Sequence, residues 1–175
     1  SRGLGDVYKR QPDYSSQVAD YFFDKEKGFF FDRRLKDGSF IQEPGCEAYT
    51  PLWTEVATAD QVKAMLPLLT DTAKFSTYIP FPTVAADNPK YNPRGYWRGP
   101  IWLDQTYFAI RGLRNYGYNK MADEYTLQVF DRLQGLKEGA PIHENYGTHT
   151  GELLKAPHFS WSSSHLLMLY DDYGK

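Results

Sequence analysis

This sequence has a single cysteine, little net charge and no long apolar run, and each shortage excludes a class of protein. Because Cys46 has no partner in the chain, an internal disulfide and a cysteine-based metal cluster are both excluded. The formal net charge is −2 with both signs interspersed, so we expect no surface for nucleic acid or another polyanion. No apolar run approaches the roughly 20 residues that span a bilayer, so no membrane contact is expected from this segment.

Aromatic residues, by contrast, are abundant: 14 Tyr, 11 Phe and 4 Trp make up 17% of the 175 residues. Aromatic rings stack on the apolar faces of sugars, but they also fill helical cores, so composition alone does not choose between the two. The length and a hydrophobic content of 41% suit one domain with a substantial core. Residues 1–11 show no periodicity and resemble a translated adapter-like leader, so the domain is expected to span residues 12–175.

Helical periodicity recurs along the chain, whereas the regular alternation of strands and helices typical of a parallel sheet is missing. Helices are expected at residues 13–23, 58–69, 98–116, 120–136 and 160–170, with a proline-rich loop at 77–92. Thr58 begins a pattern like a capping box, Pro67 should end or kink its helix, and Pro100 suits a first helical turn. A tight turn joins two of these helices into an αα-hairpin, and repeated hairpins with function on their loops are the plan of an α/α toroid. The sequence therefore predicts an all-α fold.

Two segments that mix polar and aromatic residues carry the candidate site. The first is GYWRGPIW at residues 95–102, and the second is IHENYG at 142–147, which FSWS follows at 159–162. In the second segment Glu144 stands between a histidine and Asn-Tyr, a setting with donors to orient a carboxylate and a partly dry wall to keep it basic. Taken alone, Glu144 would be interpreted as a solvated loop residue. The first segment favours one carbohydrate pocket built from both.

In this order, GYWRGPIWLDQTYFAIRGLRNYGY and IHENYGTHTGELLKAPHFSWSSSHLLMLY resemble the carboxy-terminal catalytic segment of glycoside hydrolase family 63, over about residues 75–173. That family includes processing α-glucosidases and bacterial hydrolases of mannosyl- or glucosylglycerate, and the related trehalases share its toroidal fold. The resemblance implies an incomplete (α/α)6 barrel of about five or six helices, with apolar side chains exposed on the flank where others would pack.

The resemblance also implies an inverting mechanism, in which one carboxyl group protonates the leaving oxygen and the other deprotonates the attacking water. Glu144 matches the family's base, and no aspartate in this sequence matches its general acid. The chain is therefore expected to be part of an α-glucosidase-like enzyme that hydrolyses oligosaccharides or small glucosides without a cofactor. A trehalase-like enzyme, a mannosyl- or glucosylglycerate hydrolase and a non-catalytic carbohydrate-binding fragment are the alternatives.

The substrate contacts expected from this resemblance are Trp97, Arg98, Trp102, Asp104, Tyr146 and Trp161. The tryptophans would wall the sugar, although core packing is the alternative for each of them. Arg98 would donate paired hydrogen bonds to hydroxyls or a carboxylate, or else form an ion pair with a helix-end carboxylate. For Asp104 a structural role is the alternative, and Tyr146 would orient the base. The histidines show no metal-ligand spacing on one face, so no zinc site is expected.

Overall fold

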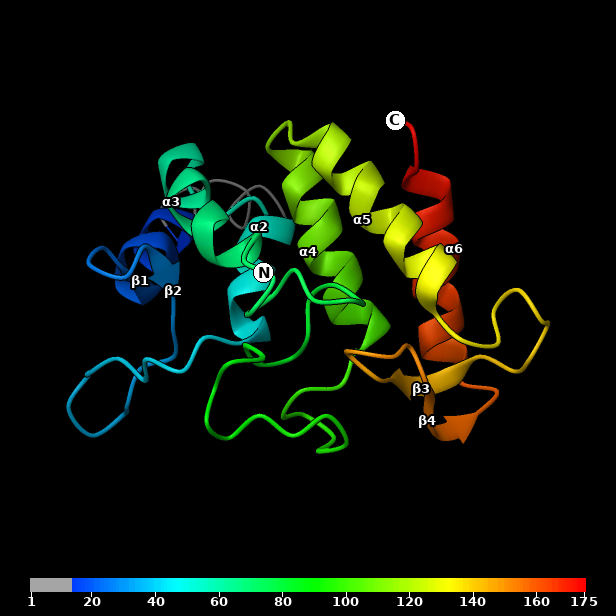
Figure 1. Ribbon diagram of the computed structural model, residues 1–175. Coiled ribbons are helices and arrows are strands. Elements are labelled where there is room, and N and C mark those ends of the chain that lie inside the picture. The colour runs from blue at the N-terminus through cyan, green and yellow to red at the C-terminus, as the bar shows by residue number, and fades with distance from the viewer. Residues whose placement is uncertain (1–13) are drawn as a thin grey trace, which may run out of the picture.

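Helices dominate the fold, and most of the long loops between them gather at one end of the molecule (Figure 1). The computed structural model describes residues 14–175, so the expected leader at residues 1–11 lies outside the described residues. Residues 14–22 are helical. The elements that follow are β1 (Phe23–Asp24), β2 (Phe29–Phe30), the short 3-10 helix η1 (Cys46–Ala48), α2 (Tyr49–Trp53), α3 (Ala59–Leu69), α4 (Leu103–Asn115), α5 (Asn119–Arg132), β3 (His143–Tyr146), β4 (Leu153–Pro157) and α6 (Ser160–Asp172). None of the described helices is long and apolar enough to cross a membrane.

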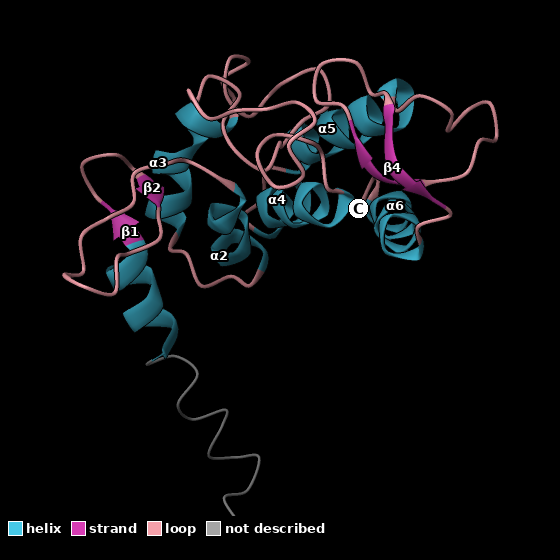
Figure 2. Ribbon diagram, turned by 90° about the horizontal axis from the view of Figure 1, so that it is seen from below, coloured by secondary structure: helices cyan, strands magenta, loops and turns pink. Residues whose placement is uncertain are grey.

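The central element is α4, which packs against α2, α5 and α6. Seen from below in Figure 2, α2, α4 and α6 stand in a row, with α5 against one side of it. Gly112 allows the approach of α2, because a Cβ atom at this position would lie only 2.5 Å from the Cβ of Leu52. Leu52, Leu113 and Val129 are fully buried where these helices meet, so the core runs through α4.

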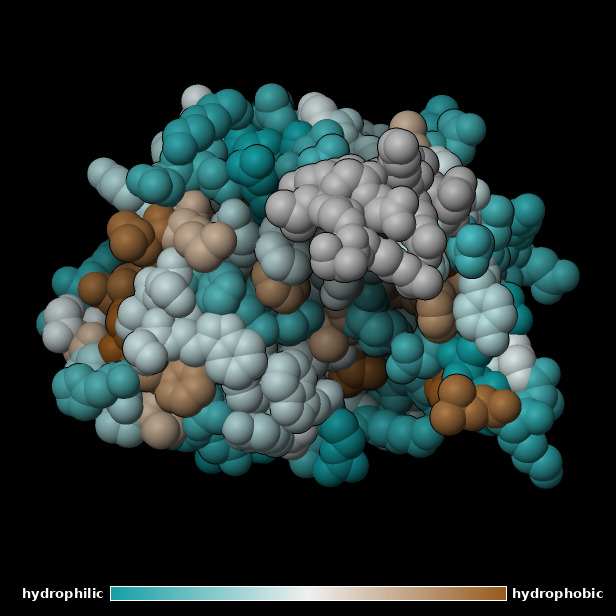
Figure 3. All heavy atoms as spheres, turned by 180° about the vertical axis from the view of Figure 1, so that it is seen from behind, coloured by the Kyte–Doolittle hydropathy of each residue, from teal (hydrophilic) through white to brown (hydrophobic). Residues whose placement is uncertain are grey.

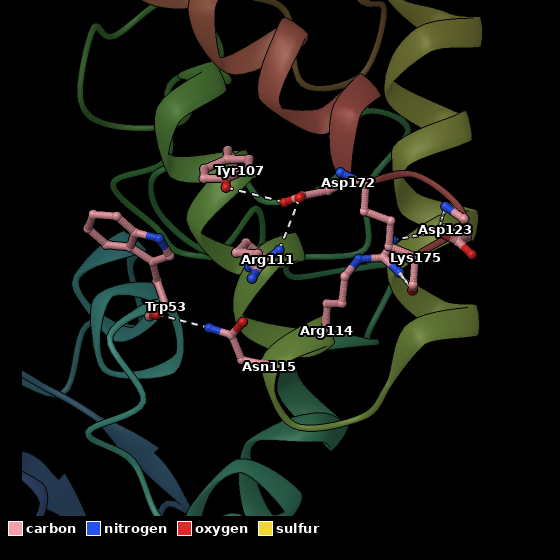
Figure 4. A network of polar contacts seen from close by, with 9 residues as sticks. Trp53, Tyr107, Arg111, Arg114, Asn115, Asp123, Asp172 and Lys175 are labelled. Carbon is pink, nitrogen blue, oxygen red and sulfur yellow. Dashed lines mark hydrogen bonds and ion pairs between the residues drawn. The ribbon is translucent and has the colours of Figure 1, made fainter.

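Polar contacts join the far end of α4 to its neighbours (Figure 4). Asp172 of α6 accepts a hydrogen bond from the Tyr107 hydroxyl at 3.2 Å and pairs with Arg111 at 3.0 Å. Arg114 forms an ion pair with Asp123 of α5 and donates to the backbone oxygen of the last residue at 2.7 Å. The carboxyl end of α4 therefore fixes α5 and α6 by charge as well as by packing.

Helix α3 begins with the expected capping box and contains a proline in its last turn. Thr58 accepts from the backbone of Gln61 while the Gln61 side chain accepts from the backbone of Thr58, which confirms the capping box. Pro67 was expected to end or kink the helix; α3 continues past this proline and ends at Leu69, as the sequence predicted. A proline this close to a carboxyl end removes a single helical hydrogen bond, and the buried side chains of Met65 and Leu69 hold the last turn in place.

The all-α expectation is wrong in detail, because two small antiparallel sheets interrupt a mostly helical fold. One of them, β3–β4, contains Glu144, which was expected in a loop. The expected helical turn at Pro100 is also absent, since Ile101 exchanges backbone hydrogen bonds with Tyr146 at 2.9 and 3.1 Å. These bonds keep Ile101 extended, so α4 begins only at Leu103.

The expected helix at residues 120–136 ends early, at Arg132. The next residue, Leu133, has an extended backbone with ψ 118°, and Gly135 takes a positive φ of 81°. The backbone N–H of Gln134 then bonds to the oxygen of Gly151 at 3.0 Å. The chain leaves the helix here because this segment pairs with the loop of the β3–β4 hairpin.

Apolar side chains of α6 remain on the surface. Leu167 and Tyr170 are 65% and 70% exposed, and Met168 is also exposed. Brown apolar surface gathers at the left edge of Figure 3, on the side where α6 lies once the view of Figure 1 is turned by 180°. The last helix therefore has one face in the core and a second apolar face that no described element covers.

We predict that Gly112→Ala destabilises the fold by about 1–2 kcal/mol. Alanine favours a helix over glycine by about 1 kcal/mol, but overpacking a close contact typically costs about 1–3 kcal/mol. The new methyl group would meet backbone atoms of Leu52 and Trp53 at 3.0 and 3.1 Å, and backbone cannot rotate away. Denaturant unfolding measures the change. Lys63→Ala at an exposed position of α3 is the control, with an expected change within about 0.5 kcal/mol; a stabilised Gly112→Ala protein would contradict the packing argument.

Candidate active site

Strand β3 carries Glu144 and is fixed from two sides. Its end is paired through Tyr146 with Ile101, just before α4, and Asn145 lies opposite Leu154 of β4. The Ser162 hydroxyl, in the first turn of α6, donates to the backbone oxygen of Glu144 at 3.1 Å. The backbone at Glu144 is therefore held by the starts of both α4 and α6.

The carboxylate of Glu144 accepts a hydrogen bond from the hydroxyl of Tyr96. Tyr96 is exposed and takes a left-handed backbone with φ 38°, a conformation that non-glycine residues rarely adopt. The hydrogen bond to Glu144, and secondarily burial, raises the pKa of the Tyr96 phenol above its ordinary value of 10.0. Sequence reasoning missed Tyr96, although it directly precedes Trp97 in the same motif.

Three tryptophans form a continuous surface beside this pair, which we call the tryptophan platform (Trp97, Trp102 and Trp161). The rings of Trp97 and Trp102 are stacked, with centroids 4.1 Å apart and an angle of 5° between the ring planes. Trp161 meets Trp102 edge to face at 5.6 Å, and the Trp102 indole donates to the backbone oxygen of Tyr96 at 2.8 Å. Trp102 is buried, whereas Trp97 and Trp161 are 43% and 45% exposed, so the platform has a buried centre and two exposed indoles.

Of the expected contacts, the structure thus brings Glu144, Trp97, Trp102 and Trp161 together at the loop end of the helices. Arg98 follows Trp97 and faces the neighbouring pocket. Tyr146 and Asp104 do not reach the surface, with exposures of 1% and 3%.

The two buried residues have structural partners. The Tyr146 hydroxyl accepts from the backbone N–H of His143 at 3.0 Å, and Asp104 accepts from the side chain of Gln105 at 2.8 Å. The Tyr146 hydroxyl therefore fixes the strand immediately before Glu144. Asp104 lies in the first turn of α4, where a negative charge complements the helix dipole.

A pocket of about 250 Å³ lies beside the platform, and Trp97 and Arg98 form part of its lining. Three carboxyl groups, of Asp32, Glu43 and Glu47, line it from the opposite side. Burial, and then the nearby charge of Asp32, raises the pKa of Glu47 from 4.5 to about 7, while backbone N–H groups lower it in part. Sequence reasoning missed Glu47, which carried no motif; its proximity to Asp32 is a tertiary contact.

No group of three histidine, cysteine, aspartate or glutamate side chains within residues 14–175 is arranged to hold a metal ion. What the arrangement offers chemically is a half-buried carboxylate with one phenol donor, next to exposed indole faces. A carboxylate held in this way can accept a proton from water, and the indole faces can stack on a sugar ring.

Residues 6–162 match the family described as the mannosylglycerate hydrolase MGH1-like glycoside hydrolase domain. The mannosylglycerate hydrolase of Thermus thermophilus is 28% identical over 81% of this chain and 33% of its own length. A crystal structure of the mannosylglycerate hydrolase of glycoside hydrolase family 63 from the same species, in complex with glucose, shares the fold. Its TM-score is 0.73 and its identity 24%, over 86% of this chain and 34% of the other.

The neutral trehalase Nth1 of Saccharomyces cerevisiae also has this fold, with a TM-score of 0.74 and 20% identity over 98% of this chain and 30% of the trehalase. The chain spans about a third of the length of the curated relatives that it matches.

We predict that Glu144→Gln lowers the pKa of the Tyr96 phenol toward its ordinary value. A hydrogen bond to a carboxylate stabilises the neutral phenol, and an amide at this position removes the negative charge that favours it. NMR of protein with 13C-labelled tyrosine, titrated through the alkaline range, follows each phenol separately. The Tyr146 phenol, whose pKa is raised chiefly by burial, serves as the internal control and should keep its titration curve. An unchanged Tyr96 curve would show that this hydrogen bond does not form in solution.

We predict that stability falls as the pH rises from about 4.5 to about 7, because Glu47 must ionise in a half-buried position beside Asp32. Its folded pKa lies above the unfolded value, so the native state holds the proton more tightly and loses this advantage above pH 7. A shift of this size corresponds to at most about 3 kcal/mol. Glu47→Gln cannot ionise and should be more stable than the wild type at pH 8 but not at pH 4. Urea unfolding at both pH values measures this, and parallel pH profiles for the two proteins would contradict it.

Proposed function

Because this chain belongs to the mannosylglycerate hydrolase MGH1-like glycoside hydrolase family, within glycoside hydrolase family 63, we propose that it provides the general base and part of the sugar-binding surface of an inverting α-glycosidase. The observation that carries the proposal is the Glu144 carboxylate, which is bonded to Tyr96 and lies beside the tryptophan platform. Within residues 14–175, no other carboxylate accepts a hydrogen bond from a phenol beside the tryptophan platform.

In the proposed reaction Glu144 accepts a proton from the water that attacks the anomeric carbon. Tyr96 donates to one oxygen of the carboxylate, which orients the group and leaves its other oxygen for the water. The hydroxyl of Ser162 and the pairing of Ile101 with Tyr146 keep the strand from shifting, so the base stays in place. Trp97 and Trp161 offer exposed ring faces on which the sugar is stacked.

The second carboxyl group of the reaction, the general acid, is proposed to come from a segment outside this chain. No aspartate here has the sequence context of the family's acid, and the curated relatives are about three times as long. The helices would then form part of an (α/α)6 barrel with residues 12–175 as one portion of that domain. The exposed apolar face of α6, with Leu167 and Met168, is the flank on which further helices would pack.

For the substrate we propose a small α-glycoside with a mannosyl or glucosyl group, and favour mannosylglycerate over larger oligosaccharides. The support is that two curated bacterial relatives are named mannosylglycerate hydrolases. Arg98 is exposed beside Trp97, where its guanidinium could bind the carboxylate of a glycerate group. The trehalase with the same fold makes trehalose the second candidate.

In a protein that joins this chain to the rest of its catalytic domain, Glu144→Gln is expected to lower hydrolysis by roughly 10²–10⁴-fold, with little change in sugar binding. The amide keeps the shape of the side chain but cannot take a proton from water. The measurement is initial rates on mannosylglycerate, glucosylglycerate and trehalose. Glu138→Gln, on an exposed loop, makes the same chemical change away from the site and should keep the wild-type rate.

Two outcomes would contradict the proposal. Near-wild-type turnover by Glu144→Gln would show that Glu144 is not the general base. Retention of anomeric configuration, read by NMR of the first product, would show that the mechanism is not inverting. Inversion further requires the acid to stand roughly 6.5–9.5 Å from the Glu144 carboxyl group to admit a water molecule. A full rate on trehalose alone would favour the second candidate substrate.

A further inference from the structure

The pocket beside the tryptophan platform has the size of a site for one small ring. Its volume is about 250 Å³, slightly below the range of about 300–1,000 Å³ of pockets that hold drug-sized ligands. It opens between the segment that carries Asp32 and Glu47 and the segment that carries Trp97 and Arg98. A disaccharide would exceed it, whereas a single pyranose would not.

Trp97 connects this pocket to the platform. Its indole stacks on the buried Trp102 and also lines the pocket, so one ring borders both. Because Trp102 supports it from beneath and Trp97 is still 43% exposed, the ring is fixed in orientation and accessible. A fixed, accessible indole is the surface on which the apolar face of a pyranose stacks.

The opposite wall holds two carboxyl groups that share a small space. Asp32 and Glu47 line this pocket and also a second one of about 190 Å³ next to the helical residues 14–22. Glu47 fits because residue 45 is glycine, where a Cβ atom would lie 2.4 Å from its carboxyl oxygen. No side chain within residues 14–175 donates a hydrogen bond to Glu47, and only the backbone N–H groups of Gly45 and Glu47 itself lower its pKa.

The other ionisable groups around Glu47 are not among the causes of its raised pKa. Glu43, the third carboxyl group of the lining, is already bound by Asn88 at 2.5 Å and by Lys90 at 3.1 Å. Burial raises the pKa of the Cys46 thiol to about 12 and that of the Tyr49 phenol well above its ordinary value, so both are neutral around pH 7. Beyond these, the groups to consider are Arg98, whose side chain is exposed, and Asp104 of α4, whose charge contributes to the raised pKa of Cys46.

A neutral and an ionised carboxyl group side by side offer what a sugar needs. A protonated carboxyl has one O–H donor, and a carboxylate has acceptors only. Each hydroxyl of a pyranose both donates and accepts, so two neighbouring hydroxyls are satisfied by one donor and one acceptor. Two ionised carboxylates would accept from both hydroxyls, so this pair of side chains would supply no donor to a hydroxyl oxygen.

We propose that this pocket binds one neutral pyranose unit of the substrate, with its ring on Trp97 and with Glu47 donating and Asp32 accepting hydrogen bonds at neighbouring hydroxyls. Glu47 is then a specificity-determining residue, which selects a ring with two adjacent hydroxyls at this position. The inference rests on the proposed function, since it names a sugar subsite of the same site.

The test is an NMR titration of this chain with D-mannose and, separately, D-glucose, following the indole N–H signal of Trp97, which Trp97→Phe identifies. Binding that needs protonated Glu47 should weaken about tenfold between pH 6 and pH 8, because roughly a tenth of a group with a pKa of about 7 keeps its proton at pH 8. Glu47→Gln keeps an N–H donor and cannot ionise, so its affinity should be the same at both pH values. Glu47→Ala should lose binding at both.

A matched variant tests whether the effect belongs to Glu47: Glu138→Gln, exposed and remote from the pocket, should keep the wild-type pH profile. Equal affinity at pH 6 and pH 8, unaltered binding by Glu47→Ala, or no saturable binding would each overturn the pocket assignment. The role of Glu144 is tested separately, by the rate of hydrolysis. If Glu144→Gln abolishes hydrolysis but Glu47→Ala leaves sugar binding unaltered, the pocket assignment is wrong and the proposed function still holds.

Discussion

The pairing of Ile101 with Tyr146 is the constraint on which the candidate site depends. Two backbone hydrogen bonds, at 2.9 and 3.1 Å, tie the strand of Glu144 to the segment that enters α4. Because of these bonds α4 begins only at Leu103, and Tyr96 and Trp97 lie on the irregular segment that precedes it. Together with the hydrogen bond from the Thr148 hydroxyl to the backbone oxygen of Gly99 at 2.7 Å, this bridge fixes the relation between the two motifs. The site is thus built by backbone pairing, and side chains complete it.

Aromatic stacking then converts this backbone arrangement into a surface. Trp102 is buried and bonded to the backbone of Tyr96, so it acts as the base on which Trp97 stacks and against which Trp161 rests. Tyr96 also meets Trp102 edge to face at 4.9 Å, which places its hydroxyl next to Glu144. One buried indole therefore organises the phenol that orients the carboxylate and the exposed rings proposed to hold the sugar.

Charge is distributed unequally over the same region. Glu144 stands next to a neutral phenol donor, whereas the half-buried Glu47 stands next to another carboxyl group. Environment, rather than residue type, thus separates the proposed base from a carboxyl group that holds its proton more tightly. At the carboxyl end of α4, by contrast, Arg111 and Arg114 pair with carboxylates of α6 and α5.

The sequence by itself determined the main helices, the capping box at Thr58, the family and the motif around Glu144, because each depends on residues close together in the chain or on a linear pattern. It did not determine the β3–β4 hairpin, whose polar residues show no strand alternation and whose pairing partner for Tyr146 lies far upstream. Likewise only the tertiary structure decided that Tyr146 is buried and that Glu47 meets Asp32. Burial and the approach of like charges are set by distant segments packing together, and no local pattern encodes them.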